Sequence, residues 1–501
     1  ENGEINDSHL MRGPRGLVWH EGRQRLFVLN KLANSISVIN TLTDEIVGEV
    51  PAGSVDPTPL AAKEGRGFLF DARLSGNGTA SCGSCHVDAD VDGLAWDLGD
   101  PNGVMTTVMG ANLAVHDTTP RPRAMHPMKG PMVTQTLRGL ATNQLLHWRG
   151  DRATLRHFNP TFRDLMGGSL ITDADMDAMK AYLNTLRHHP NPNRKLDNSL
   201  PATFVGGNPA RGETLFNIHI NHCGVCHTPP TGSDNNIDDM RNVAGTQPMK
   251  TPPLQTVYQR AQLDLRTGVT NVVGFGLSPD GTGSRHFLPT IHFYELDQLT
   301  GQDFADVTAF VLCFQTGTAP AVGYSRSITL ANVNAPEVTT DLVTLESQAR
   351  SNACDLVVRG TIAGRWRSFL FDRASQLYRA DSTLEPSRTR SQMLALLGVD
   401  DILTFMGVPH GRGPQLSIDR NGDGVVNADE AKEAILFDRQ GSSIQLRWRE
   451  QTRDWLLEHS STPIGNWQPN LRLRTRDGEY ESVEETASEE PERFFRLRRV
   501  W

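Results

Sequence analysis

Two copies of one five-residue motif constrain this chain more than any other feature of its sequence. Four of its six cysteines stand in Cys82-Gly83-Ser84-Cys85-His86 and Cys223-Gly224-Val225-Cys226-His227. C-x-x-C-H is the attachment motif of c-type haem, in which both thiols bond to the porphyrin and the histidine becomes an axial ligand of the iron. A Cys₄ zinc site or a redox dithiol is the alternative, but a histidine follows both pairs. The sequence therefore predicts two covalently bound haem c groups, with His86 and His227 as proximal ligands.

The cysteines also predict the compartment. Haem is attached in this way outside the cytoplasm, so we expect an exported protein that is periplasmic, extracellular or held at the cell surface. An oxidising compartment favours a disulfide between the two remaining cysteines, Cys313 and Cys354, over two buried free thiols. The chain opens on polar residues with no signal peptide, as expected of a mature or trimmed form.

Composition excludes several classes of protein. With 501 residues, 38% of them hydrophobic and 21% charged, the chain is long enough for several domains and too apolar for global disorder. The formal net charge of −9 argues against nucleic acid as the main partner. No apolar run approaches the roughly 18–20 residues of a transmembrane helix, so we expect no membrane-spanning segment.

The surroundings of the two motifs repeat. A short segment with a Leu-Phe pair precedes each motif, at 66–70 and 211–216, and we expect each segment to be a helix that packs on a porphyrin. A second, amphipathic helix closes each half, at 172–186 and 303–314, with apolar side chains three and four residues apart.

The repeated helices predict the fold class. Thr172 and Asp175 form a capping-box start for the first closing helix. Found in the same order around both motifs, the helices indicate two tandem cytochrome c domains, over 56–195 and 196–320. The predicted fold is therefore mainly α in these two domains, within a multidomain α+β protein that has a β-rich N-terminal segment and a small C-terminal β-sandwich.

Both ends of the chain have β patterns. Residues 1–55 contain short strands that resemble one blade of a YVTN-type β-propeller, and a single blade cannot close a ring. Either further blades precede Glu1 in the precursor, or this small sheet packs on the haem domains. Residues 441–501 predict the β-sandwich. Between them, 321–440 is expected to be a connecting region that holds the disulfide and a calcium loop.

Residues 419–430 match a calcium-binding EF-hand loop. Ligand positions 1, 3, 5, 7, 9 and 12 fall on Asp419, Asn421, Asp423, Val425 (through its carbonyl), Asn427 and Glu430. Gly424 takes position 6, where the turn is sharpest. An Asp/Asn/Gly-rich turn without a metal is the alternative. Exported proteins meet abundant calcium, so we expect a structural site.

At residues 69–79, which read Leu-Phe-Asp-Ala-Arg-Leu-Ser-Gly-Asn-Gly-Thr, the chain resembles bacterial di-haem cytochrome c peroxidases and MauG-type di-haem enzymes. Thr136-Leu137-Arg138 and Trp148-Arg149-Gly150-Asp151-Arg152 extend the resemblance, which spans about 60–320. In that family one six-coordinate haem donates electrons, and the other meets peroxide or oxygen. The resemblance implies an oxidoreductase of this kind.

The resemblance also implies roles for individual residues. A tryptophan lies between the haems in the family, and Trp148 stands at the matching place, with a core aromatic as the alternative. The family's distal histidine shortly precedes Lys-Gly-Pro. This implies His126 as a distal ligand or pocket residue of the first haem, with Met128 or an open iron as the alternatives.

Departures from the family pattern affect both distal sides. Leu165 replaces the family's catalytic distal glutamate, and Asp164 is the expected substitute. After the second haem the family's His-Asp-Gly becomes Pro279-Asp280-Gly281, so the second distal ligand must come from elsewhere. The candidates are His286, His292 and Tyr294, with Met249 or an open site as the alternatives.

The sequence thus predicts an exported di-haem oxidoreductase that activates peroxide or oxygen at one haem while the other supplies electrons. The expected partners are a redox protein that donates or accepts electrons and, for MauG-type chemistry, a protein substrate. The alternative is an electron-transfer cytochrome in a larger exported assembly, with both irons six-coordinate. A high-spin ferric signal in an absorption or EPR spectrum would separate the enzyme from the electron carrier.

Overall fold

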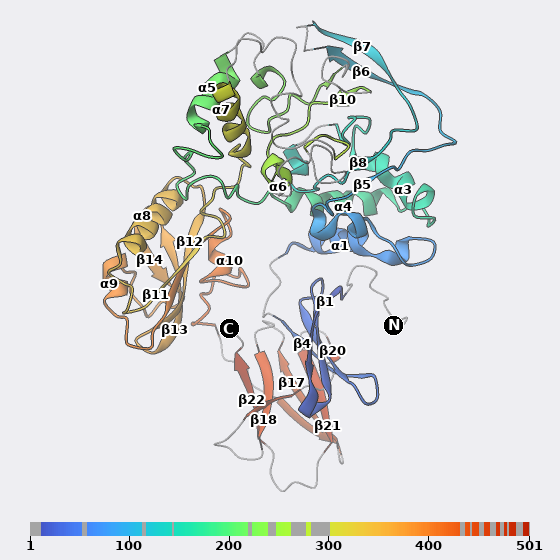
Figure 1. Ribbon diagram of the computed structural model, residues 1–501. Coiled ribbons are helices and arrows are strands. Elements are labelled where there is room, and N and C mark those ends of the chain that lie inside the picture. The colour runs from blue at the N-terminus through green and yellow to red at the C-terminus, as the bar shows by residue number, and fades with distance from the viewer. Residues whose placement is uncertain are drawn as a thin grey trace. The chain divides into compact units, whose positions relative to one another are not determined.

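The chain forms two compact units in a computed structural model (Figure 1). The larger unit comprises 64–379 and 387–413 and contains both C-x-x-C-H motifs; the smaller comprises 1–63, 380–386 and 414–501. The structure describes residues 12–52, 58–112, 117–142, 145–218, 223–238, 247–261, 277–281, 301–430, 436–440, 443–449, 455–460, 467–470, 475–477, 480–486 and 494–499.

Around the first motif, helix α1 (Leu60–Phe70) crosses helix α4 (Asp173–Thr185) at Gly65. A Cβ atom on Gly65 would lie 1.8 Å from the carbonyl oxygen of Ala178, so only glycine allows this close crossing. The short helices α2 (Cys82–Cys85) and α3 (Asn159–Asp164) complete the helices of this region. Its apolar core consists of Leu69, Ala89, Leu155, Phe162, Met176, Met179 and Leu183.

Helix α4 confirms the predicted first closing helix. The Thr172 hydroxyl accepts a hydrogen bond from the backbone N–H of Asp175 at 3.2 Å, and the Asp175 carboxylate accepts one from the N–H of Thr172 at 3.1 Å. Met176, Met179 and Leu183 form the buried face of the helix. The capping box and the apolar spacing therefore predicted both the start of the helix and its core-facing side.

Around the second motif, α5 (Pro209–Ile218) crosses α7 (Gly301–Leu312) in the same way, and the two lie side by side in Figure 1. A Cβ atom on Gly212 would lie 1.9 Å from the carbonyl oxygen of Asp306. The rings of Phe216, Phe310 and Phe314 pack as a triangle, with centroid distances of 5.1, 5.8 and 6.4 Å. Helix α7 confirms the second closing helix, two residues earlier than predicted.

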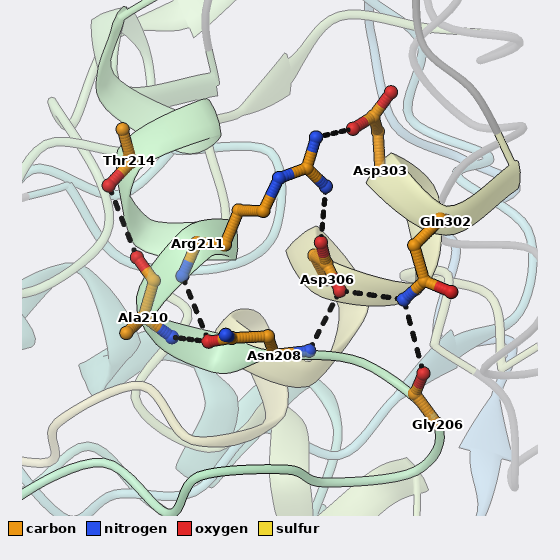
Figure 2. Close-up of polar contacts among 8 residues, drawn as sticks. All are labelled: Gly206, Asn208, Ala210, Arg211, Thr214, Gln302, Asp303 and Asp306. Carbon is orange, nitrogen blue, oxygen red and sulfur yellow. Dashed lines mark hydrogen bonds and ion pairs between the residues drawn. The ribbon is translucent and has the colours of Figure 1, made fainter.

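A polar clamp adds to this second crossing (Figure 2). The Arg211 guanidinium of α5 pairs with both Asp303 and Asp306 of α7. Asp306 is buried and also accepts the backbone N–H of Asn208 at 2.7 Å. The Asn208 side chain caps α5, because it accepts the backbone N–H groups of Ala210 and Arg211, both at 3.1 Å. The clamp thus ties the start of α5 to α7.

A small sheet joins the two motif-bearing regions. The hairpin of β6 (Thr106–Asn112) and β7 (Asp117–Met125) follows the first motif, and β9 (Ile237–Asp238) and β10 (Met249–Lys250) follow the second. Their order is β10-β9-β6-β7, with β9 parallel to β6. The further elements here are β5 (Ala95–Trp96), which pairs with β8 (Met132–Val133), and α6 (Val257–Ala261).

The rest of the larger unit is an α+β domain where the sequence predicted a connecting region. Five antiparallel strands take the order β11-β15-β12-β13-β14, and α8 contacts β11, β12 and β15. The bounds are β11 (Ser325–Ile328), α8 (Pro336–Arg350), β12 (Asp355–Ile362), β13 (Arg365–Asp372), β14 (Leu377–Ala380), α9 (Arg390–Leu394) and β15 (Leu403–Val408). Helix α10 (Gly413–Leu416) begins at the last residue of this unit and belongs mainly to the smaller one.

The predicted disulfide is not formed. Cys313, which follows α7, and Cys354, which precedes β12, are both buried free thiols. The Cys313 Sγ donates to the backbone carbonyl of Asn193 at 3.5 Å, so this cysteine packs in the core as a small apolar residue with a weak donor.

The smaller unit confirms the predicted β patterns. Four antiparallel strands, β1 (Pro14–His20), β2 (Arg25–Asn30), β3 (Ser35–Asn40) and β4 (Glu45–Pro51), form one sheet in chain order, as in a propeller blade. At the C-terminal end, two sheets share a core of Leu446, Trp448, Leu457 and Val483. Their orders are β16-β17-β21-β20 and β19-β18-β22, with bounds β16 (Leu436–Gln440), β17 (Ser443–Arg449), β18 (Trp455–Ser460), β19 (Gln468–Pro469), β20 (Thr475–Asp477), β21 (Tyr480–Thr486) and β22 (Phe494–Arg499).

The prediction that the chain is mainly α in two tandem cytochrome c domains is wrong. In the described part of the chain, helices and strands hold similar shares of the residues. The hairpin β6–β7 interrupts the first predicted domain, and the five-stranded sheet fills the predicted connecting region. The hairpin differs from the prediction because the helices around the first motif do not determine the structure of the segment between them. The sheet differs because 321–440 was predicted as a connecting region with no secondary structure assigned to it.

Candidate functional site

The first C-x-x-C-H motif is wound into one helical turn. Cys82 and Cys85 are the ends of α2, and the backbone N–H of His86 bonds to the carbonyl of Cys82 at 2.9 Å. Residues three apart on a helix lie on one face, so both thiols face the same side. Ser84, within the motif, fixes the start of the turn, because its hydroxyl accepts the N–H of Ser81 at 3.0 Å.

The second motif repeats this turn. Cys223 begins a 3₁₀ helix (Cys223–Val225), and the N–H of His227 bonds to the carbonyl of Cys223 at 2.8 Å. The His227 ring is buried, and its Nδ1 bonds to the carbonyl oxygen of Gly232 at 2.8 Å. A metal-ligating histidine commonly donates its other ring N–H to such a carbonyl.

These residues fit two haem groups in their chemistry. All four motif cysteines are free thiols, and burial raises the pKa of Cys82 to about 11 and of Cys226 to about 12. Burial lowers the pKa of both motif histidines, so each imidazole is neutral, as an iron ligand must be. The Nδ1 atom of His86 is buried and has no hydrogen-bond partner within the described part of the chain.

Trp148 lies where the two motif-bearing regions meet. Its indole N–H donates to the carbonyl of Val133 at 2.7 Å, within the first region. Its own carbonyl accepts the backbone N–H of Lys250, in β10 of the second region, at 2.8 Å. The Arg260 guanidinium of α6 lies over the ring, 5.2 Å from its centroid. The Trp148 residue therefore contacts elements from both regions.

Two buried cations from the second region flank this tryptophan. The Lys250 ammonium donates to the carbonyl of Leu145 at 2.7 Å, and burial lowers its pKa to about 8. Burial lowers the pKa of Arg260 to about 10, and its guanidinium donates to the carbonyl of Ser278. Sequence reasoning missed both residues, since neither belongs to a motif.

His126 and Asp164 have different surroundings. The His126 ring is exposed, with Nδ1 accepting the N–H of Met128 at 3.0 Å, and its carbonyl accepts from Arg149 at 2.8 Å, next to Trp148 in the chain. Asp164 lies on the surface and pairs with the neighbouring Arg163 at 2.7 Å, which lowers the pKa of Asp164. A surface carboxylate held ionised in this way is a poor proton donor.

The second distal candidates cannot be placed. His286, His292 and Tyr294 lie outside the described residues. Met249, the alternative, is a buried residue of β10.

One pair of titratable side chains in the Trp148 loop escaped the sequence analysis. His147 Nδ1 and Asp151 Oδ1 lie 2.8 Å apart. The sequence assigns His147 no role, because the four-residue spacing of a histidine and an aspartate carries no signal outside a helix.

The predicted calcium loop is a closed turn in the smaller unit. Asp419 accepts the N–H groups of Gly422 and Gly424 at 2.8 and 3.0 Å, and Asp423 accepts that of Val425 at 2.8 Å. Gly424 has a φ of +88°, as the sharp turn at position 6 requires.

The ligand set of that loop is only partly directed inward. The Asn427 side chain is buried and turned to the backbone, donating to the carbonyl of Ser417 at 2.6 Å, and Asn421 donates to Asp423 at 2.9 Å. Glu430 ends the described part of the loop. Within the described ranges, no three His, Cys, Asp or Glu side chains gather as a metal site. Calcium binding here stays a prediction.

Comparisons with known proteins identify no family. No family model matches the chain, and no curated protein matches it. One solved structure with local similarity is hydrazine synthase from Kuenenia stuttgartiensis, at 16% identity over 52% of this chain and 89% of that chain, with a TM-score of 0.34. A likeness this weak carries no argument about fold or function. In the described part of the chain, no helix is long and apolar enough to cross a membrane.

Proposed function

We propose that this chain is an exported di-haem oxidoreductase that reduces peroxide, or oxygen, at one haem with electrons supplied through the other. Cys82, Cys85 and His86 would hold the first haem. Cys223, Cys226 and His227 would hold the second. Bound haem supplies an iron that exchanges single electrons and, where one coordination position is open, takes up peroxide or oxygen.

The placement of Trp148 carries this proposal. The Trp148 side chain donates to Val133 of the first region, and its backbone bonds to Lys250 of the second. The indole therefore offers a π system along the route between the two motifs. The fixed indole N–H and the backbone bond hold the ring in one orientation. A pair of haems joined by such a route supports an enzyme that gathers two electrons for one reaction.

The cation over the ring sets how Trp148 would act. A guanidinium 5.2 Å from the centroid attracts the electrons of the ring. The same charge opposes removal of an electron from the indole, since it repels the positive charge that would remain. Trp148 therefore conducts electrons between the two sites without itself being held in an oxidised state.

The partners follow from this chemistry. A di-haem reductase needs a redox protein that delivers electrons one at a time. In MauG-type chemistry, a protein substrate would supply the electrons instead. The compartment follows from haem attachment, which requires export.

Absorption and EPR spectroscopy of the purified protein, with acid–acetone extraction, test the proposal. We expect haem to stay with the polypeptide after extraction, a high-spin ferric signal from one iron, and peroxide-dependent oxidation of a reduced donor. Purely low-spin signals without turnover would favour the electron-transfer alternative. Haem that passes into the acetone would contradict both the oxidoreductase proposal and the electron-transfer alternative.

A further inference from the structure

The loop that carries Trp148 holds His147 and Asp151 together. Their side chains meet at 2.8 Å, and the loop closes through backbone bonds from Gly150 N–H to the His147 carbonyl at 3.2 Å and from Leu146 N–H to the Arg152 carbonyl at 2.6 Å. His147 has a φ of +67°, a conformation that histidine adopts infrequently. The backbone is thus turned at this residue, and the turned loop brings the two side chains into contact.

The charges around the pair settle its protonation at neutral pH. Burial raises the pKa of Asp151, but the hydrogen bond from His147 and the charges of Arg152 and Arg149 outweigh it and hold the pKa below its usual value. Burial lowers the pKa of His147; the bond to Asp151 opposes this, and the charges of Lys129 and Arg152 add to it. Asp151 is therefore a carboxylate and His147 a neutral imidazole.

The hydrogen bond also assigns the tautomer. A carboxylate can only accept, so the ring hydrogen lies on Nδ1 and the free lone pair lies on Nε2. An aspartate that fixes the tautomer and orientation of a histidine makes its other nitrogen a directed proton acceptor.

The pair lies beside the first attachment motif. The His147 ring packs edge-on against Phe158, with 4.7 Å between ring centroids. Phe158 packs against the same apolar cluster as Cys82.

We propose that His147 is the proton-transfer residue for hydrogen peroxide at the first haem site, and that Asp151 is the residue that positions it. This inference rests on the proposed function. His147 Nε2 takes the proton from one peroxide oxygen and gives it to the other, so that the O–O bond breaks with water as the leaving group. Two electrons from the redox partner and two protons from solvent complete the reduction of one peroxide to two waters.

Among the described candidates for the first haem site, this assignment supplies a function that the others do not. Leu165 stands where the distal glutamate was expected, and it has no proton to give. Asp164 is held in a surface ion pair, and the His126 ring is exposed and has no carboxylate among its hydrogen-bond partners in the described part of the chain.

Cyanide binding to the ferric protein tests the inference without turnover. Hydrogen cyanide must lose its proton to bind iron, so the association rate reports a base beside the metal. We expect His147→Gln to slow association by roughly 10²-fold or more, the range of a positioned general base. The exposed His157, whose Nδ1 accepts the N–H of Thr154 at 3.2 Å, offers a matched control, and His157→Gln should leave the rate unchanged.

Two variants of Asp151 separate positioning from packing. Asp151→Asn can turn its amide N–H toward Nδ1, which favours the hydrogen on Nε2, so association should slow almost as much as in His147→Gln. Asp151→Glu keeps a carboxylate and should recover much of the rate. Unchanged haem absorption spectra would show that the fold around the haems is intact in each variant.

The outcomes distinguish this inference from the proposed function. If the wild-type protein binds cyanide and His147→Gln binds it as fast, the inference is wrong and the oxidoreductase proposal stands. If the wild-type protein binds no cyanide, both irons are closed, and the proposed function fails together with the inference.

Discussion

Each of the two motif-bearing regions contains the same kind of contact between a glycine and a backbone carbonyl, and the side chains around that contact differ between the regions. Gly65 meets the carbonyl of Ala178, and Gly212 meets that of Asp306, at almost the same built Cβ distance of 1.8 and 1.9 Å. The side chain four residues after each carbonyl, Tyr182 or Phe310, is the next neighbour of the glycine. The two crossings therefore have the same register, and the glycine contact, unlike the side chains, is common to both.

The side chains give each region its own character. The first crossing is apolar, with Phe70 edge-on to Tyr182 at 6.3 Å. The second adds the clamp of Arg211 on two aspartates. The first region also carries the His147–Asp151 pair, whereas the second contributes the buried cations beside Trp148. This asymmetry assigns proton handling to the first region and the electrostatic control of the shared tryptophan to the second.

Removing one pair of thiols is expected to have the largest effect. Cys82→Ala with Cys85→Ala should reduce the covalent haem content from two per chain to one, because thioether attachment needs the thiols. Cys223→Ala with Cys226→Ala should remove the other haem. Intact-protein mass spectrometry measures the content. Loss of both haems from either double variant would show that the regions do not bind haem independently.

Alanine at the crossing glycines tests whether the two crossings are equivalent. Gly65→Ala and Gly212→Ala should each lower the free energy of unfolding by about 3 kcal/mol, the upper range of overpacking, because the methyl group meets a carbonyl oxygen. Denaturant unfolding measures the change. Gly301→Ala, at the start of α7 with open space around its Cβ direction, is the control and should be nearly neutral. A loss at only one crossing would break the equivalence.

Trp148→Phe tests the join between the regions. The phenyl ring keeps most of the bulk but loses the N–H bond to Val133 and part of the π system. We expect electron transfer between the haems to slow roughly tenfold, about 1.4 kcal/mol in activation free energy, with both haem spectra unchanged. Flash photolysis of the half-reduced protein measures this rate. A packing role alone predicts lost stability with unchanged electron transfer.

Acid should weaken the second crossing more than the first. Burial raises the pKa of Asp306, but the bonds from Asn208, Arg211 and Gln302 outweigh it and lower the pKa below its usual value. A depressed folded pKa gives stability that is present above about pH 4, the unfolded pKa, and is lost as pH falls through the folded pKa. Asp306→Asn should lower the melting temperature at pH 7 and flatten its decline below pH 4.

Chelation of calcium is expected to have the smallest effect. If calcium binds at 419–430, removing it should lower the melting temperature by a few degrees, in line with roughly 1 kcal/mol for a domain of this size, and leave both haem spectra unchanged. Isothermal titration with Ca²⁺ and the Asp419→Asn variant checks the site. A chelator that alters the haem spectra would contradict a purely structural role.

The sequence was most informative where a local rule sets the structure. The capping box at Thr172 located α4, and the alternation of apolar residues located β1 to β4. It was least informative where distant segments meet: β9 and β10 are two residues long and acquire strand geometry only by pairing. The His147–Asp151 contact depends on a positive φ at His147, a residue other than glycine. The spacing of residues in a sequence does not predict such a backbone conformation.

The parallel pairing of β9 with β6 has a consequence for how the chain can be divided. The segment at 190–193 connects the two motif-bearing regions, yet strands from both lie in one sheet, and Val133 N–H bonds to the carbonyl of Pro279 at 2.9 Å. Cutting the chain at 190–193 would therefore leave two fragments that remain associated. Expressed separately, each fragment would expose an unpaired strand edge and should recover its structure only when mixed with the other.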